Sequence, residues 1–304
     1  SAATSDFTVT VNTTAPTISS IVISSATGIQ NNLLNVGDNV SVTATFSESV
    51  IVDNASGAPT LTLVVGDDNQ TATYRSGSGG TTLVFQYTIQ AGETDSNGIS
   101  MRADVLALNS GTIKDTTGNN ATLTHSALTD NASYKVDTTA PTANFTKAND
   151  NVGTVRGDFT SDNTTDDTAL VLSGTNESGS SVKVYDNSTE LGTATAESTT
   201  SWSYSATVAN GTTYLFNVRE TDLAGNTSAA TSNLAVTGDT TAPTANFTKA
   251  NDNVGTVRGD FTSDNTTDDT ALVLSGTNES GSSVKVYDNS TELGAATVSG
   301  TSWS

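Results

Sequence analysis

Residues 202–218 read WSYSATVANGTTYLFNV, and this stretch decides the fold class. Apolar and polar side chains alternate over 202–208, a run rich in apolar residues follows over 213–219, and Asn210-Gly211 lies between the two runs. Alternation with a period of two is typical of a half-buried strand, and Asn-Gly favours a tight turn between strands. The stretch therefore predicts two antiparallel strands joined as a hairpin.

Similar short runs extend outward from this stretch in both directions. No segment has the apolar spacing of an amphipathic helix. About seven short strands over roughly 100 residues, with a turn every 8–12 residues, are typical of a β-sandwich. The sequence therefore predicts an all-β protein built from antiparallel sandwiches. The further strands are expected at 40–46, 61–63, 83–89, 106–108, 112–114, 169–173, 181–185 and 234–236.

Internal repeats divide the chain into modules. Residues 137–192 recur without change at 239–294, and residues 1–17 resemble 228–244. Such repeats indicate an array of similar units. We therefore expect the last strand of a preceding module at 1–12, whole modules at 13–136 and 137–238, and an incomplete repeat at 239–304. We expect further chain or a neighbouring chain to complete that last module.

The composition excludes several classes of function. The chain has 304 residues, with 11 Lys or Arg against 32 Asp or Glu, a net charge of −21. Nucleic acids and anionic membranes need a basic surface, so neither is an expected partner. No apolar run is long enough to insert into a membrane. Cysteine is absent and His125 is the only histidine, so we predict no catalytic residues and no enzyme.

Several motifs are similar to those of a known family. Residues 174–195 read GTNESGSSVKVYDNSTELGTAT, residues 220–228 read ETDLAGNTS, and residues 239–244 read DTTAPT. With them the second module resembles the bacterial Ig-like modules of giant repetitive adhesins, and the first module resembles a sister Ig-like type. The resemblance implies an elongated tandem array, secretion to the bacterial cell surface, and calcium bound at module junctions.

Oxygen-rich clusters near the module boundaries are candidate calcium ligands. Calcium takes six to eight oxygens from carboxylates, carbonyls and amides. We expect the loop that follows the strand at 213–219 to face the next linker, and a matching arrangement one module earlier. Turn formation alone is the alternative for any single loop. The expected ligands are Glu220, Asp222, Asn226, Asp239 and Asp252 at one junction, and Asp115, Asn119, Asp137 and Asp150 at the other.

One further linker residue and one further segment affect the calcium prediction. Asn12 stands where the other linkers have Asp137 and Asp239, so we expect a weaker site or none there. Glu93, Asp95 and Asn97 alternate ahead of a glycine, which resembles the front half of an acidic calcium loop. A plain turn explains that second pattern equally well.

These features together favour a structural role. We expect an extender segment of a cell-surface adhesin, in which calcium stiffens the array and a distal domain binds the target for cell-surface or biofilm attachment. Its partners are neighbouring modules of the same polypeptide, or other copies in a filament. The alternatives are an extracellular carbohydrate-binding module and a subunit of a self-assembling surface filament. The alternating context of Trp202 predicts a core residue rather than a sugar-stacking platform.

Overall fold

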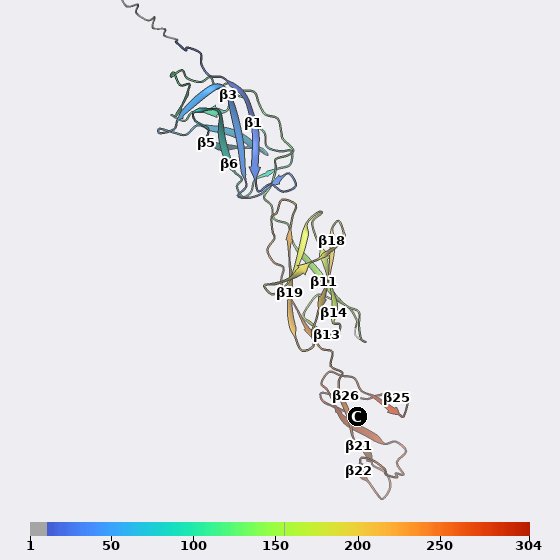
Figure 1. Cartoon of the computed structure of the whole chain (residues 1–304). Coiled ribbons are helices and arrows are strands. Elements are labelled where there is room, and N and C mark those ends of the chain that lie inside the picture. The colour runs from blue at the N-terminus through green and yellow to red at the C-terminus, as the bar shows by residue number, and fades with distance from the viewer. Residues whose placement is uncertain (1–10, 155) are drawn as a thin grey trace, which may run out of the picture. The chain divides into compact units, whose positions relative to one another are not determined.

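A computed structural model describes residues 11–154 and 156–304, and the strand expected within 1–12 lies almost wholly outside these ranges. The described residues form strands and loops and no helix, as Figure 1 shows, so the all-β prediction is confirmed. None of their segments is a helix capable of crossing a membrane. The chain divides into two compact units. One holds 1–163, 169–207 and 213–236, and the other holds 164–168, 208–212 and 237–304.

The first module is built around one large antiparallel sheet. Its order is β1-β3-β6-β5-β4-β8, with β9 added to β3, and a small sheet β2-β10-β7 lies beside it. The strands are β1 (Ile18–Thr27), β2 (Leu33–Leu34), β3 (Asn39–Asp53), β4 (Thr60–Val65), β5 (Asp68–Ser76), β6 (Gly80–Thr88), β7 (Thr94–Asp95), β8 (Leu106–Ala107), β9 (Thr112–Lys114) and β10 (Lys135–Asp137).

The core of the first module follows directly from alternation. In β3 every second side chain from Val40 to Phe46 is buried, and the residues between them are half-buried. Phe85 of β6 is fully buried and meets the edge of the Tyr74 ring at a centroid distance of 6.0 Å. Edge-to-face packing of this kind stabilises a pair beyond the area that it buries. The expected strands at 40–46, 61–63 and 83–89 are therefore confirmed.

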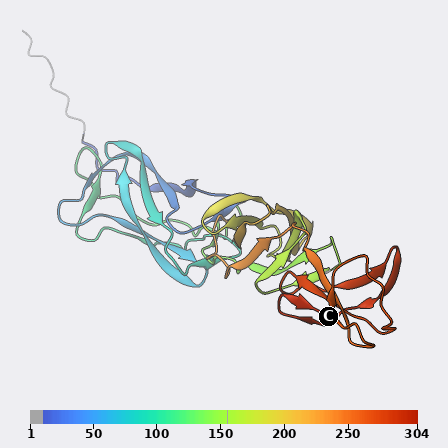
Figure 2. The same cartoon turned by 90° about the horizontal axis from the view of Figure 1, so that it is seen from below.

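The second module is a sandwich of two five-stranded sheets, seen from two directions in Figures 1 and 2. One sheet has the order β12-β11-β14-β18-β17, and the other has the order β13-β20-β19-β15-β16. The strands are β11 (Asn144–Asp150), β12 (Gly157–Phe159), β13 (Asn163–Thr165), β14 (Ala169–Thr175), β15 (Ser181–Asp186), β16 (Thr189–Thr193), β17 (Thr195–Ser198), β18 (Ser201–Thr207), β19 (Thr213–Thr221) and β20 (Leu234–Gly238).

The strands β18 and β19 exist as expected, but the predicted hairpin between them is wrong. β18 pairs with β14 and β17, whereas β19 belongs to the opposite sheet. The N–H of Val208 donates to Thr168 O at 3.1 Å, and the N–H of Gly211 donates to Gly238 O at 2.7 Å. Because its donors bond to other segments, the Asn210-Gly211 turn arches from one sheet to the other. β18 buries Trp202 and Ala206 on one face, and β19 buries Phe216, Asn217 and Val218 in a row. Neither burial pattern separates an arch from a hairpin.

Residues 239–304 repeat the first half of this arrangement. One sheet has the order β22-β21-β23-β27-β26, and β24 pairs with β25. Trp303 is 7% exposed and lies 6.3 Å from the ring of Phe247, as Trp202 does from Phe145 at 5.9 Å. The strands are β21 (Ala245–Asp252), β22 (Gly259–Phe261), β23 (Val273–Asn278), β24 (Lys285–Asp288), β25 (Thr291–Ala295), β26 (Val298–Ser299) and β27 (Ser302–Trp303).

Candidate functional site

The loop after β19 lies beside the linker that leads into its own module. β20 is the last strand and carries the chain away toward the following linker, where the N–H of Asp239 donates to Thr165 O at 2.8 Å. The loop before β20 must therefore lie at the opposite end of the sandwich, where the module begins. There the side-chain amide of Asn226 donates to the main-chain oxygen of Asp137 at 2.8 Å.

This placement corrects one expectation from the sequence. We expected residues 220–226 to face Asp239 and Asp252 of the following module, and that expectation is wrong. The hydrogen bond from Asn226 to Asp137 decides the matter, because it places the loop at the linker that leads into its own module. The repeat at 239–304 does not include a counterpart of 220–226, so no such loop is described beside Asp239.

Asp222 organises the loop. Its Oδ1 accepts hydrogen bonds from the N–H of Ala224 at 2.9 Å and of Asn226 at 2.8 Å. Its Oδ2 accepts from the side-chain amide of Asn226 at 2.9 Å. Gly225 has φ = 93°, a left-handed conformation that favours glycine and lets the loop turn sharply. The same amide of Asn226 thus connects the loop to the linker at Asp137.

The first module contacts this loop through two asparagines. The side-chain amide of Asn31 donates to Leu223 O at 2.8 Å, and that of Asn35 donates to Ala224 O at 2.9 Å. The backbone of Asn31 itself is in a left-handed conformation, with φ = 50°. The loop of the second module therefore has partners both in the linker and in the module before it.

Glu220 is an unusual residue at this place. It is 0% exposed, and its Oε1 accepts from the N–H of Glu177 and from the hydroxyl of Ser180. Its Oε2 is buried and has no hydrogen-bond partner. A buried carboxylate oxygen without a partner costs several kcal/mol unless a positive charge compensates it. Glu220 is therefore the acid of this loop whose charge most needs a compensating partner.

Glu177 belongs to the same cluster, and sequence analysis missed it. Loss of hydration, and then the charges of Asp222, Asp137 and Glu220, raise the pKa of the Glu177 carboxyl. Four acids therefore stand close enough to repel one another. The signal was present in the motif TNESG at 175–179, where an acid directly precedes a turn. We call Asp137, Glu177, Glu220, Asp222 and Asn226 the second joint.

No basic side chain neutralises the second joint. Among the described residues the ion pairs are Lys147–Asp158, Lys183–Glu190, Lys249–Asp260 and Lys285–Glu292, all between half-exposed side chains. Within those residues no three acidic or imidazole groups stand ready-made around one metal position. The donor set nevertheless fits calcium in kind, because it offers carboxylate and amide oxygens and an orphaned buried oxygen.

Asp115 and Asn119 form a second loop of the same design, but beside a different linker from the one expected. The side-chain amide of Asn12 donates to Asp115 Oδ2 at 3.1 Å, and that of Asn119 donates to Asn12 O at 3.1 Å. The expectation that this loop meets Asp137 is therefore wrong, because both residues bond to Asn12 in the linker before the first module. We call Asn12, Ile113, Asp115, Thr117 and Asn119 the first joint.

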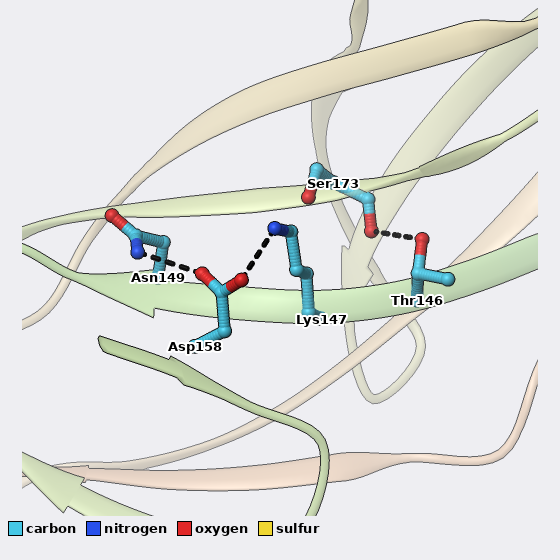
Figure 3. Close-up of polar contacts among 5 residues, drawn as sticks. All are labelled: Thr146, Lys147, Asn149, Asp158 and Ser173. Carbon is cyan, nitrogen blue, oxygen red and sulfur yellow. Dashed lines mark hydrogen bonds and ion pairs between the residues drawn. The ribbon is translucent and has the colours of Figure 1, made fainter.

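Asp150 and Asp252 lie away from the linkers with which they were grouped. Asp150 ends β11, a strand of seven residues that starts after the linker, so roughly 20 Å separates its two ends. Neighbouring Asn149 donates to Asp158 Oδ1 at 2.7 Å, and Lys147 pairs with the same carboxylate, as Figure 3 shows. In the repeat, Asp252 accepts from Val254 N–H at 3.0 Å. The structure does not bring these aspartates to either joint.

The alternating acids of the first module line one pocket together with Asp137, but each has hydrogen-bond partners of its own. Glu93 accepts from the Tyr87 hydroxyl and from Gln90 N–H. Asp95 accepts from the N–H groups of Gly66 at 2.9 Å and Gly98 at 2.7 Å. Asn97 donates instead to Asp130 Oδ2 at 2.6 Å. These hydrogen bonds fix the segment as a turn and connect it to Gly66 and Asp130, which lie 29 and 33 residues away from their partners in the chain.

His125 is held by backbone groups. Its Nε2 accepts from Val105 N–H at 3.0 Å, and its Nδ1 lies 2.9 Å from Ser126 O. Its own N–H donates to Asp104 Oδ1 at 2.8 Å. Because Nε2 accepts a hydrogen bond, the ring is in the tautomer that carries its proton on Nδ1. Both ring nitrogens are thereby engaged in fastening two loops of the first module.

Comparison with known proteins bears mainly on the second module. No curated protein sequence matches the chain. The solved CbhA fibronectin(III)-like modules of Clostridium thermocellum are 11% identical, and the match covers 72% of this chain and 94% of theirs with a TM-score of 0.29. A Bacteroides ovatus protein, SGBP-B of a mixed-linkage glucan utilization locus, was solved in complex with a mixed-linkage heptasaccharide. It is 12% identical, and the match covers 74% of this chain and 46% of that one with a TM-score of 0.20.

With TM-scores this low, neither structure bears on the function of this chain. The family model of the bacterial Ig-like domain matches residues 137–240, about a third of the length. That range includes both five-stranded sheets and every residue of the second joint. Over residues 137–240 the chain is therefore similar to a bacterial Ig-like domain.

Proposed function

We propose that this chain is a structural extender segment of a secreted bacterial surface protein, with calcium bound at the second joint. The observation that carries the proposal is the buried, unpartnered Oε2 of Glu220. The match of residues 137–240 to a bacterial Ig-like domain supports the extracellular setting. In this role the chain projects a distal adhesive domain away from the cell and contributes no catalysis of its own.

Charge explains why a cation is needed. Residues 13–136 carry four basic and ten acidic side chains, and residues 137–238 carry four basic and twelve acidic ones. Modules of like charge repel each other across a joint. Bound calcium supplies the positive charge that cancels this repulsion. Asp137, Glu177, Glu220 and Asp222 would hold it, and they connect the linker to the body of the second module.

The residues around the cation provide the rest of the stiffness. Asn226 already bonds the loop to the linker at Asp137, and Asn31 and Asn35 bond the first module to the same loop. With the acids neutralised, these amide contacts act together and fix the direction in which the chain leaves the first module. Without a cation, repulsion among the acids opposes the same contacts.

Neither tryptophan provides an aromatic platform for the carbohydrate-binding alternative. Trp202 is 2% exposed and Trp303 is 7% exposed. The indole N–H of Trp202 donates to Asn144 O at 3.2 Å, so the ring is turned into the sandwich. The prediction of a core tryptophan is confirmed. Sugar stacking needs an exposed ring, and neither tryptophan offers one.

A calcium titration of the whole chain tests the proposal. Calcium should raise the melting temperature of the second module and increase the radius of gyration measured by X-ray scattering, relative to the protein in EGTA. Glu220→Gln should abolish both responses. In EGTA this variant should also be more stable than wild type, by about 1–3 kcal/mol in free energy of unfolding, because the buried uncompensated charge is removed. Its melting temperature should rise accordingly.

Glu197→Gln is the matched control, because it removes one carboxylate from the exposed strand β17, which is not part of the second joint. It should leave the calcium response intact. If wild type shows no change in melting or scattering on addition of calcium, the proposal is wrong. If Glu197→Gln removes the response as fully as Glu220→Gln does, calcium acts through overall charge and the site is not at the second joint.

A further inference from the structure

The two joints are built on one hydrogen-bonded frame. The N–H of Asp115 donates to Asn119 O at 3.0 Å, and the N–H of Asp222 donates to Asn226 O at 3.0 Å. In each loop the first aspartate also accepts from the N–H of the asparagine at 2.8 Å. The side-chain amide of that asparagine then donates to the linker main chain, at Asn12 O in one joint and at Asp137 O in the other. Position by position, the two joints therefore correspond.

Two positions of the frame differ in charge. The linker residue is Asn12 in the first joint and Asp137 in the second. Two residues before the aspartate, the first joint has Ile113, which is 1% exposed, and the second has Glu220, which is 0% exposed. A buried isoleucine needs no partner, whereas a buried carboxylate does. The first joint thus lacks two of the carboxylates that make the second joint electrostatically strained.

Asp115 is saturated by donors from the chain itself. Its Oδ1 accepts from the N–H groups of Thr117 and Asn119 at 2.9 and 2.8 Å. Its Oδ2 accepts from Asn119 Nδ2 at 2.7 Å, Thr117 Oγ1 at 2.9 Å and Asn12 Nδ2 at 3.1 Å. A carboxylate offers about four lone-pair sites, so these five donors leave no room for a metal ion.

Asp222 has the same two donors on Oδ1 but only Asn226 Nδ2 on Oδ2. Ala224 stands where the first joint has Thr117, so the hydroxyl donor is missing. Asp137 stands where the first joint has Asn12, so the second amide donor is missing as well. Oδ2 of Asp222 therefore keeps lone pairs that a cation can use, whereas Oδ2 of Asp115 does not.

We propose that the first joint is closed by amides and needs no cation, and that the linker residue decides between the two kinds of joint. The claim for the second joint rests on the proposed calcium site, whereas the claim for the first rests on its own hydrogen bonds. The pKa of Asp115 is consistent with its saturation by hydrogen-bond donors. Burial acts to raise the pKa of Asp115, but the hydrogen bonds from Asn119 and Thr117 outweigh it and lower the pKa to about 2. The chain would then combine one joint that responds to calcium with one that does not.

Hydrogen exchange on the full chain tests this, because residues 112–120 and 219–227 are unique in the sequence and give separate peptides. In wild type, calcium should slow exchange at 222–226 on the order of tenfold and leave 115–119 unchanged. Asn12→Asp should speed exchange at 115–119 in EGTA, and calcium should reverse that effect. Asn12→Ala, which removes the donor and adds no charge, should speed exchange equally in EGTA and in calcium.

The possible failures are distinct. If calcium slows exchange at 115–119 of wild type as strongly as at 222–226, the first joint binds a cation and the inference is overturned. If Asn12→Asp gives no calcium response, the linker residue does not decide the kind of joint. If wild type shows no response at 222–226 while Asn12→Asp still gains one at 115–119, the proposed function fails and the inference about the linker residue stands.

Discussion

Trp202 lies directly against the backbone of Gly174 on the neighbouring strand. The two residues are paired in the β14–β18 register, and a Cβ atom on Gly174 would lie 2.7 Å from Cζ2 of the indole. The same Cβ would lie 2.0 Å from Asn144 O, the carbonyl to which the indole N–H donates. Because Gly174 has no side chain, strand β14 leaves room for the indole ring of Trp202.

Gly174→Ala should destabilise the second module by about 3 kcal/mol, because neither the ring nor the β11 backbone can move aside without breaking the sheet. Thermal unfolding followed by tryptophan fluorescence measures the change. Ser205→Ala, on the exposed face of β18, should stay within about 0.5 kcal/mol of wild type. A small effect of Gly174→Ala would mean that Trp202 repacks freely, in contradiction to the geometry.

Asn226→Ala should loosen the linker at Asp137 and destabilise the second module by about 1–2 kcal/mol, because it removes donors to Asp137 O and to Asp222 Oδ2. Denaturant unfolding in calcium measures this. Asn149→Ala breaks one exposed bond to Asp158 and serves as the control, with an expected change below about 0.5 kcal/mol. Equal effects of the two variants would contradict a special role for Asn226.

Glu177 gives the second module a pH dependence in EGTA. Its pKa in the folded protein is raised above the ordinary value of 4.5, so the folded state binds the proton more tightly than the unfolded state. Stability therefore falls as pH rises through the range above 4.5 and recovers as pH drops. Melting temperatures across that range should show this slope. Glu177→Gln should flatten it, and an unchanged slope would mean that another group is responsible.

Asp115 gives the first module the opposite dependence. Its pKa is lowered from 3.8 to about 2, so its stabilising effect is fully present above 3.8 and is lost as pH falls toward 2. Acid unfolding of wild type and Asp115→Asn, followed by circular dichroism, measures this. The difference in stability between them should be constant at neutral pH and shrink below pH 3.8. A difference that stays constant down to pH 2 would contradict the assignment.

Alternation carried most of the fold prediction, because one side of each strand is buried. Alternation located β15 and β18 within a residue or two, and short apolar runs located β14, β19 and β20. It did not tell which strands share a sheet, so the turn between β18 and β19 was predicted as a hairpin when it is an arch. That distinction depends on hydrogen bonds from Val208 and Gly211 to segments far along the chain.

The candidate site was predicted by composition but placed one module too late. Asp222, Asn226 and Asp137 were each identified, yet they were assigned to different junctions. Their meeting depends on the direction of the last strand, a property of the whole module that no local pattern contains. Glu177 was missed because an acid in a turn is ordinary, and only the fold brings it beside Glu220.

The bond from Asn226 to Asp137 spans 89 residues of chain, and the bond from Asn119 to Asn12 spans 107. Closing so long a loop is slow compared with local pairing, because its entropy must be lost before the contact forms. Each linker therefore stays loose until almost all of the module behind it has emerged and folded. When the chain emerges from a ribosome or a secretion channel, its linkers therefore become rigid one at a time, each after a whole module has emerged.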